Sequence, residues 1–239
     1  SSQLSGVLMA DDAVNTAAGI ADAGGTWTGS QPVADISWHN AALFCNWLTT
    51  GNAYSGYYAI TGTGDSATAV PNALSHDAYA AANGPVYFLP TEDEWYKAAY
   101  YNSAAGNYYQ YPTGSDTAPT AVASGTTVGT AVYGGGAVTA PADVNLSGGL
   151  SPYLTMGQGG NVWEWNETLI GGNRGLRGGW LGNIDIGLWS GYRLDFDPAG
   201  EDGSVGFRVA SIVPVIVPEP ASALLLVLPV LGLMARRRR

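Results

Sequence analysis

Apolar side chains recur with the period of a helix near residue 40 of the chain. Four of them stand at positions i, i+3, i+4 and i+7: Ala41, Phe44, Cys45 and Leu48. Ser37 precedes this stripe as a good N-cap, and Gly51 follows it as a helix stop. The pattern predicts one amphipathic helix, with Cys45 as a core thiol rather than a nucleophile. His39 lies off the stripe, so we expect it in solvent.

A second helix is predicted near residue 92. Thr91 and Glu94 have the spacing of a capping box, in which two side chains satisfy backbone N–H groups at the helix start. The apolar stripe that follows consists of Trp95, Ala98 and Ala99. Glu92, Asp93 and Glu94 fill the first turn, where the helix dipole favours negative charge. We therefore interpret them as a cap with solvated charges rather than as a carboxylate cluster.

Two long stretches show no helical period. Residues 51–84 are Gly, Ala, Ser and Thr with scattered Tyr, which predicts a surface loop. Residues 108–149 have a similar composition, for which we predict short strands and loops.

The segment GGNVWEWNE, residues 159–167, has the alternation of a strand. In a strand, Trp163 and Trp165 share one face and Glu164 points to the other. The pattern predicts two core rings and a Glu that faces a polar, loop-lined space. There it accepts backbone N–H groups, pairs with an Arg or binds a cation. Arg174 and Arg177 are the candidate partners close to it in sequence.

Charge is scarce in this chain and unevenly distributed. Charged residues make up 12%, about half the usual share of roughly 25%. Before residue 218, five basic residues stand against eighteen acidic ones, which leaves a net charge of −13. Such an acidic body repels phosphate backbones, which argues against nucleic-acid binding, and it suits an exported protein. Arg177 and Arg208 stand in apolar surroundings, which predicts buried, paired guanidinium groups.

The C-terminal segment has three parts. Pro218-Glu219-Pro220 precedes an apolar run over residues 221–235, and four arginines, 236–239, end the chain. As a helix the run would span about 22 Å, short of a hydrocarbon core of ~30 Å. The segment resembles a PEP-CTERM sorting signal, which implies export, transient membrane anchoring by the apolar helix, and cleavage by an exosortase-type enzyme. We therefore predict a domain over residues 1–211 and a linker with sorting tail over residues 212–239.

Five motifs follow one another along the body. They are PVADISWHNAALFCNWL, FLPTEDEWYKAAYY, GGNVWEW, LRGGW and GFRVA. In this order they resemble the successive motifs of the formylglycine-generating enzyme (sulfatase-modifying factor) family, from about Gln31 to Ser211. The resemblance implies an α+β domain with a C-type-lectin-like fold: two main helices, small twisted antiparallel sheets and much irregular loop. The family usually opens with a strand and a helix before the first motif. We do not see them, so we expect an N-terminal truncation.

The catalytic site that the resemblance implies is altered in this sequence. Family oxidases carry a cysteine pair shortly after the LRGGW-like motif, and that pair binds copper(I) and oxidises a substrate cysteine. The interval from Trp180 to Arg193 contains no cysteine, and Asn183 and Leu188 stand nearest to those positions. Without thiolates, no copper(I) site is expected. We interpret Trp180, Asn183, Trp189 and Arg193 as candidate ligand-binding residues instead.

The resemblance also implies a calcium site in the GGNVWEW motif. The Glu of this motif helps to bind calcium in the family, together with two carbonyl groups and an upstream Asn or Asp side chain. Glu164 and the carbonyl groups of Gly160 and Val162 match three of these ligands, whereas Gly157 stands at the upstream position. Two interpretations of Glu164 stay open: a calcium ligand, or a structural Glu in a hydrogen-bond network.

Three functions are compatible with these features. The first is an exported, non-catalytic binding module of the cell surface or extracellular space, whose exposed Tyr and Trp contact a glycan or an extracellular polymer. The second is an enzyme of the family with altered oxidase or metal chemistry. The third is a structural protein of the extracellular matrix. The absence of the cysteine pair favours the first.

Overall fold

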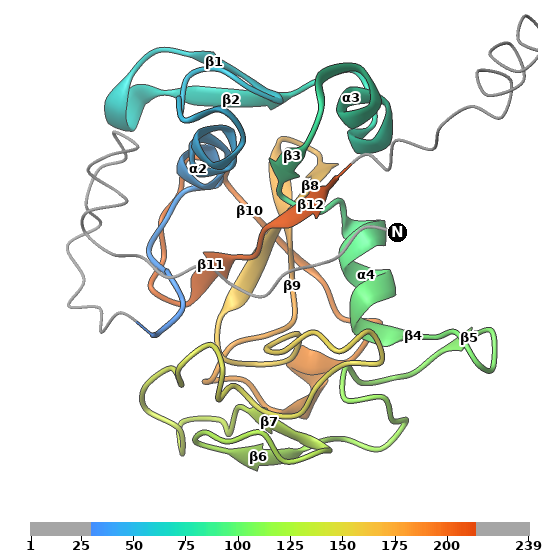
Figure 1. The fold of residues 1–239 in the computed structure, drawn as a ribbon. Helices are drawn as coiled ribbons and strands as arrows, with labels where there is room; N and C mark the ends of the chain where they lie inside the picture. Colours follow the sequence, from blue (N-terminus) through green and yellow to red (C-terminus); the bar gives the residue numbers. More distant parts are fainter. Residues whose placement is uncertain (1–29, 214–239) are drawn as a thin grey trace, which may run out of the picture.

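Helices and short strands alternate along the part of the chain that the computed structural model describes, residues 30–213 (Figure 1). The helices are α2 (Trp38–Thr50), α3 (His76–Asn83) and α4 (Glu92–Tyr100), with two 3-10 turns, η1 (Gly64–Ser66) and η2 (Asp185–Leu188). The strands before residue 140 are β1 (Tyr58–Thr61), β2 (Thr68–Pro71), β3 (Val86–Phe88), β4 (Tyr101–Asn102), β5 (Asn107–Tyr108), β6 (Thr120–Val122) and β7 (Thr130–Val132). The later strands are β8 (Trp163–Ile170), β9 (Asn173–Arg177), β10 (Leu194–Phe196), β11 (Val205–Phe207) and β12 (Ala210–Ile212).

The predicted α+β class and C-type-lectin-like architecture are confirmed, with one helix more than expected. The main sheet has the strand order β10-β9-β8-β11, in which β8 runs antiparallel to β9 and parallel to β11. Trp163 and Trp165 on β8 both lie in the main core, as the alternation predicts. Glu164 between them is buried as well, because β8 is covered on both faces. Its side chain therefore meets protein rather than an open loop pocket.

The first predicted helix is confirmed as α2. Its N-cap Ser37 accepts a hydrogen bond from the N–H of Asn40 at 3.1 Å, and Gly51 ends it in the left-handed conformation at φ 77°. Cys45 has no exposed surface, as its place on the apolar stripe predicts. Burial also raises the pKa of its thiol well above the usual value, so the thiol stays protonated and unreactive.

Residues 51–84, predicted to be a surface loop, instead form part of the core. They contain the hairpin of β1 and β2 and the additional helix α3. Several of their side chains are buried: Tyr57, Tyr58, Ala67, Ala69 and Ala80. The prediction was wrong because a core built from alanines and tyrosines has no strong apolar period.

The expectation that His39 lies in solvent is corrected as well. This side chain is half-buried, and its Nδ1 accepts a hydrogen bond from the N–H of Ala69 on β2 at 3.1 Å.

The capping box at the start of α4 is confirmed, but of the three acidic side chains in its first turn only one is fully solvated. Thr91 and Glu94 exchange backbone-to-side-chain hydrogen bonds in both directions. Asp93 is exposed, as expected. Glu92 is buried, and Glu94 is mostly covered, because both carboxylates take part in ion pairs with residues far away in sequence.

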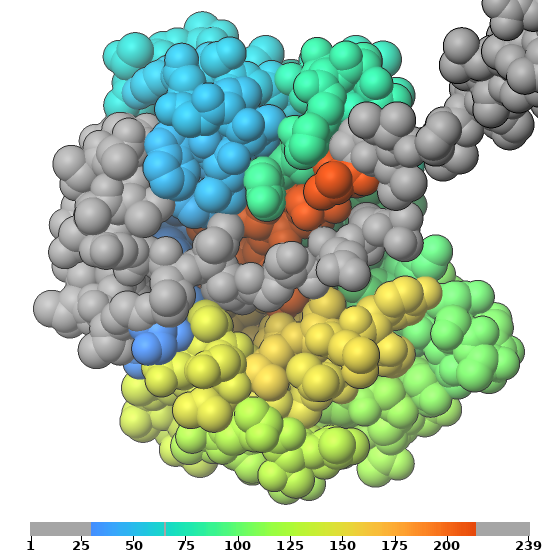
Figure 2. Space-filling model, in the orientation of Figure 1, coloured from blue at the N-terminus to red at the C-terminus, as the bar shows by residue number. Residues whose placement is uncertain are grey.

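The last two strands connect the main sheet to the helical part of the chain. β11 pairs with β8 in the main sheet, and β12 pairs antiparallel with β3 and contacts α3. Figure 2 shows this orange-red segment between the blue-to-green helical part and the yellow-green loops. Within residues 30–213 no helix is long and apolar enough to cross a membrane. The predicted apolar run 221–235 lies outside the described residues.

Candidate functional site

The segment that the resemblance makes the catalytic loop connects β9 to β10, and we call residues 178–193 the β9–β10 loop. It contains η2, which lies beside β7 in Figure 1. Asn183 shapes its first half: its Oδ1 accepts a hydrogen bond from the N–H of Trp180 at 2.9 Å. Its carbonyl oxygen accepts from the N–H groups of Gly134 and Gly135. The loop is thus tied both to itself and to the segment after β7.

Leu188 anchors the second half of the β9–β10 loop. Its side chain is fully buried and packs with Ala131 and Tyr133, and its carbonyl oxygen accepts a hydrogen bond from the hydroxyl of Tyr100 at 3.1 Å. Neither Leu188 nor Asn183 offers a thiolate at the positions where the family carries its cysteine pair. The side-chain oxygen of Asn183 already accepts a hydrogen bond from the N–H of Trp180. These two residues therefore do not fit a copper(I) ion.

The outer surface of the loop is apolar and aromatic. Ile184 is 61% exposed, Ile186 is 51% exposed and Trp189 is 41% exposed. Trp180, by contrast, is only partly exposed and packs against the main core. Of the four residues predicted to bind a ligand, Trp189 is thus presented to solvent, whereas Trp180 and Asn183 support the loop from within.

Arg193, the fourth predicted residue, closes the loop through an ion pair with α4. Its Nη2 lies 2.8 Å from Oε2 of Glu92, and Nη2 of Arg177 lies 2.6 Å from Oε1 of the same carboxylate. Arg177 also donates to the carbonyl oxygens of Ser190 and Tyr192, at 2.8 Å and 2.6 Å. One buried carboxylate and two guanidinium groups therefore fix the returning end of the loop against α4.

Glu164 forms a second buried ion pair. Arg208, rather than Arg174 or Arg177, is its partner: Nε and Nη2 each lie 2.5 Å from one of the two carboxylate oxygens. Trp95 of α4 donates its indole N–H to Oε2 of Glu164 at 2.6 Å. Arg208 is fully buried and also donates to the carbonyl oxygen of Met156. The expectation that Arg177 and Arg208 are buried and paired is therefore confirmed.

This arrangement bears on the calcium ligands that the resemblance implies. Both oxygens of Glu164 already accept charge-assisted hydrogen bonds, so a calcium ion there would have to displace the guanidinium group of Arg208. Gly157, at the upstream position, contributes no side chain. The surroundings of Glu164 therefore do not fit calcium as they stand. Calcium at Gly160, Val162 and Glu164 stays a prediction that the stability measurements below test.

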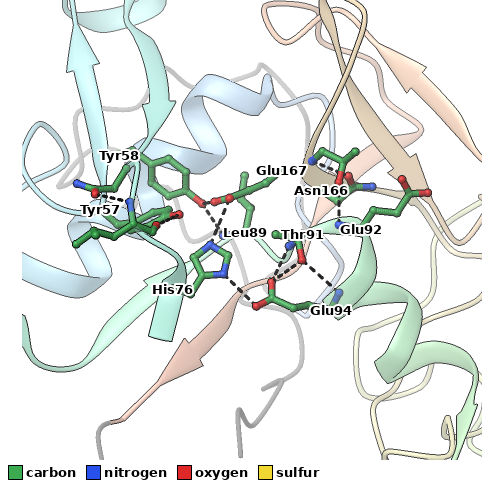
Figure 3. Close-up of polar contacts among 12 residues, drawn as sticks. Tyr57, Tyr58, His76, Leu89, Thr91, Glu92, Glu94, Asn166 and Glu167 are labelled. Atoms are coloured by element: carbon green, nitrogen blue, oxygen red, sulfur yellow. Dashed lines mark hydrogen bonds and ion pairs between the residues drawn. The ribbon is translucent and has the colours of Figure 1, made fainter. Parts of the chain in front are cut away.

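A third charged cluster, which the sequence did not indicate, lies between α3, α4 and β8 (Figure 3). His76 is buried, with Nδ1 3.0 Å from Oε1 of Glu94 and Nε2 3.2 Å from Oε2 of Glu167. The hydroxyl of Tyr58 donates to Glu167 and accepts from the N–H of Leu89 at 2.8 Å. The imidazole therefore stands between two carboxylates, with the ring of Phe88 stacked against it.

The two carboxylates decide the charge of His76. Burial alone lowers the pKa of an imidazole, but hydrogen bonds and charge–charge attraction to Glu167 and Glu94 outweigh it and raise the pKa of His76 to about 9. The pKa of Glu94 is lowered in turn, although burial opposes this shift, because His76 and the cap at Thr91 stabilise the carboxylate. At neutral pH the cluster thus holds a buried imidazolium. No local motif signals it, since His76 and Glu167 are 91 residues apart in the sequence.

Comparisons with known proteins agree with this architecture. The family model described as Sulfatase-modifying factor enzyme 1-like domain matches residues 15–213. No curated protein matches the chain. Among solved structures, the fold is similar to Treponema denticola variable protein 1, with a TM-score of 0.56 and 21% identity over 87% of this chain and 82% of that one.

Two further solved structures are similar. CarF gives a TM-score of 0.53 and 21% identity over 78% of this chain and 69% of that one. PvdO from Pseudomonas aeruginosa gives a TM-score of 0.50 and 16% identity over 79% of this chain and 65% of that one. At such identities, these likenesses show the fold alone.

Removing the charge of Glu164 should destabilise the protein strongly. Glu164→Gln leaves the fully buried guanidinium of Arg208 without its counter-charge, which typically costs about 3–5 kcal/mol. The free energy of unfolding from denaturant titration measures this cost. Asp93→Asn, which removes an exposed carboxylate from the first turn of α4, is the control and should change it by no more than about 1 kcal/mol, the value of one charge at a helix N-terminus.

Melting temperatures of the wild type and of Glu164→Gln distinguish a calcium ligand from an ion-pair partner. If Glu164 pairs with Arg208, the wild type melts at the same temperature with calcium and with a chelator. A calcium-dependent rise in melting temperature that disappears in Glu164→Gln would contradict the ion-pair account and support the calcium ligands.

His76 should make stability depend on alkaline pH. Because its pKa is raised from about 6.5 unfolded to about 9 folded, its contribution is complete below pH 6.5 and disappears as the pH rises through 9. Its size is on the order of 3 kcal/mol, at 1.36 kcal/mol per pKa unit. The measurement is the difference in unfolding free energy between wild type and His76→Gln from pH 6 to 10. His39→Gln, which removes an imidazole that no carboxylate hydrogen-bonds, should show no such decline. A constant difference for His76→Gln across this range would refute the buried imidazolium.

Proposed function

Because the chain belongs to the Sulfatase-modifying factor enzyme 1-like domain family, we propose that it is a non-catalytic binding module that uses the β9–β10 loop as its ligand surface. In the family resemblance, this loop is the place of the oxidising cysteine pair. Here the same loop holds no cysteine. Its position in the fold is kept, but its chemistry is that of a contact surface.

One observation carries the proposal: the loop is fixed from inside and apolar outside. Arg177 and Arg193 hold it to Glu92, and buried Leu188 anchors it, while Ile184 and Trp189 face solvent. Exposed apolar side chains that gather on a rigid scaffold are typical of interaction sites. A loop that is already ordered loses little conformational entropy on binding, which favours affinity.

The oxidase alternative lacks its reactive groups. Asn183 and Leu188 stand near the cysteine positions, and Cys45 is buried in α2 with its thiol held protonated. An enzyme with another chemistry would need nucleophilic or acid–base groups at the surface of the loop. The loop presents two isoleucines and a tryptophan there. Its two exposed or partly exposed charged side chains are already paired, Asp185 with the hydroxyl of Tyr111 and Arg193 with Glu92.

The proposed setting is the cell surface or the extracellular space. The acidic, charge-poor body and the resemblance of residues 218–239 to a sorting signal support export, with an exosortase-type enzyme as processing partner. The ligand class that suits exposed apolar and aromatic side chains in that setting is a glycan or another extracellular polymer. The alternative is a purely structural role in the extracellular matrix. The binding experiment below distinguishes the two roles.

Replacing the exposed tryptophan of the loop should weaken ligand binding strongly. Trp189→Ala removes a partly exposed ring of the kind that dominates interfaces, for which losses of at least about 2 kcal/mol, or roughly 30-fold in affinity, are common. The measurement is a glycan and extracellular-polymer array, followed by titration calorimetry of the best binder. Val70→Ala, on the distant hairpin strand β2 and 60% exposed, is the matched control and should bind like wild type.

Two results would overturn the proposal. Binding that Trp189→Ala leaves intact would move the ligand surface elsewhere, and no binding to any array member would favour the structural role. Incubation of the same wild-type preparation with copper(I), oxygen and a cysteine-containing sulfatase peptide should give no aldehyde. Aldehyde formation would restore the enzyme alternative.

A further inference from the structure

A pocket of about 270 Å³ is lined in part by the hairpin of β4 and β5 and by the segment that follows it. The hairpin itself, which follows α4, can be seen in Figure 1. Eight residues line the pocket: Asn102, Ser103, Tyr109, Thr113, Gly114, Leu150, Ser151 and Pro152. None of them carries a charge, and none belongs to the loop of the proposed function. The volume lies just below the range of roughly 300–1,000 Å³ typical of small-molecule sites, so it suits one ring-sized group.

The polar groups of the pocket are hydroxyls oriented by a fixed amide. Asn102 accepts the N–H groups of Ala104 and Ala105 with its Oδ1, which fixes its orientation. Its Nδ2 then donates to the hydroxyl of Tyr109 at 2.8 Å. Since that hydroxyl accepts from Asn102, its own proton is free for another acceptor, and none is present among the described residues. The arrangement leaves a hydrogen-bond donor available at the pocket wall.

Two more hydroxyls accompany it. Ser103 is exposed at the pocket, and its hydroxyl has no partner within residues 30–213. The hydroxyl of Thr113 is covered and likewise lacks a partner in the described part of the chain. Thr113 is nevertheless one of the residues that line the pocket. An unsatisfied buried hydroxyl costs free energy, so a ligand that satisfies it gains affinity.

Apolar surfaces complete the pocket. Leu150 is 42% exposed and lies next to Pro152 in the wall. Around the hairpin, tyrosine rings form a cluster: Tyr101 lies 5.0 Å from Tyr108 and 6.4 Å from Tyr153 between ring centroids. Both Tyr108 and Tyr153 are more than 40% exposed. Such rings offer flat apolar faces with a polar tip.

We propose that this pocket binds a neutral saccharide ring. A pyranose has C–H faces that suit tyrosine, Leu150 and Pro152, and hydroxyl edges that can accept from Tyr109 and exchange hydrogen bonds with Ser103 and Thr113. An acidic ligand finds no cation in the lining and meets the negative charge of the whole chain, −10. A cationic ligand finds no carboxylate there. No residue of the β9–β10 loop lines the site, so it adds a second contact for a polymer.

Gly114 provides a way to close the pocket without disturbing the fold. It has a φ of +71°, which asparagine tolerates, and a Cβ there would lie 3.8 Å from Cγ of Pro152 and 3.9 Å from Cε2 of Tyr109. An Asn side chain therefore enters the space between these two walls. Gly106 at the tip of the same hairpin has nearly the same φ, +69°, and no atom within 4 Å of its Cβ position. Gly106→Asn is the matched control.

The test is saturation-transfer difference NMR on the full chain with a panel of neutral methyl glycosides and short neutral oligosaccharides, with titration to obtain Kd. Glucuronate and indole serve as acidic and aromatic probes. At least one neutral saccharide should bind. Gly114→Asn should abolish that binding, Gly106→Asn should not, and Tyr109→Phe should weaken it about 3- to 10-fold, the value of one hydrogen bond. Tyr87→Phe, at an exposed tyrosine on β3, should bind like wild type.

Several outcomes would overturn the saccharide pocket. These are no binding by any neutral saccharide, equal binding by Gly114→Asn, or preference for glucuronate or indole. If Gly114→Asn fails to fold, Tyr109→Phe decides alone, since it keeps the ring. Trp189→Ala should leave binding to the pocket unchanged, so failure of this site and failure of the β9–β10 loop surface are distinguishable.

Discussion

The first turn of α4 is the point on which the rest of the structure depends. Three of its residues contact three different parts of the fold: Glu92 pairs with Arg177 and Arg193, Glu94 pairs with His76, and Trp95 donates to Glu164, which pairs with Arg208. Each network contains at least one buried charged side chain, for which loss of the partner is costly. One short helix therefore connects the β9–β10 loop, the inserted helix α3 and the strand β8. The FLPTEDEW sequence is thus both a helix start and the junction of three ion-pair networks.

This arrangement explains how the loop keeps its shape without a cysteine pair. The groups that position it are Arg177, Glu92 and Leu188, and none of them is a reactive cysteine. Ile184 and Trp189 are exposed on the loop that these groups hold in place, as the proposed binding role requires. The pocket beside β4 and β5 depends on the same helix, because that hairpin leaves the C-terminal end of α4 directly. The two proposed contact surfaces on one scaffold would suit a polymer that presents repeated rings.

Sequence reasoning succeeded where the determining residues are neighbours in the chain. The N-cap at Ser37, the capping box at Thr91 and the alternation of Trp163 and Trp165 all depend on spacings of two to three residues. It failed where the fold brings distant residues together: Glu164 meets Arg208 across 44 positions, and Glu92 meets Arg177 across 85. No local pattern encodes such pairs. Residues 51–84 were missed for another reason, because packed alanines carry little hydrophobic signal.

The central claim is that Glu92 holds the β9–β10 loop in place through the two guanidinium groups. Hydrogen–deuterium exchange of wild type and Glu92→Gln at neutral pH tests it most directly, because exchange reports opening of each segment separately. The account predicts faster exchange confined to the loop and the start of β10, with α2 and the core residues of β8 close to wild type. Unchanged exchange in the loop would contradict the claim, and so would an equal increase throughout the chain.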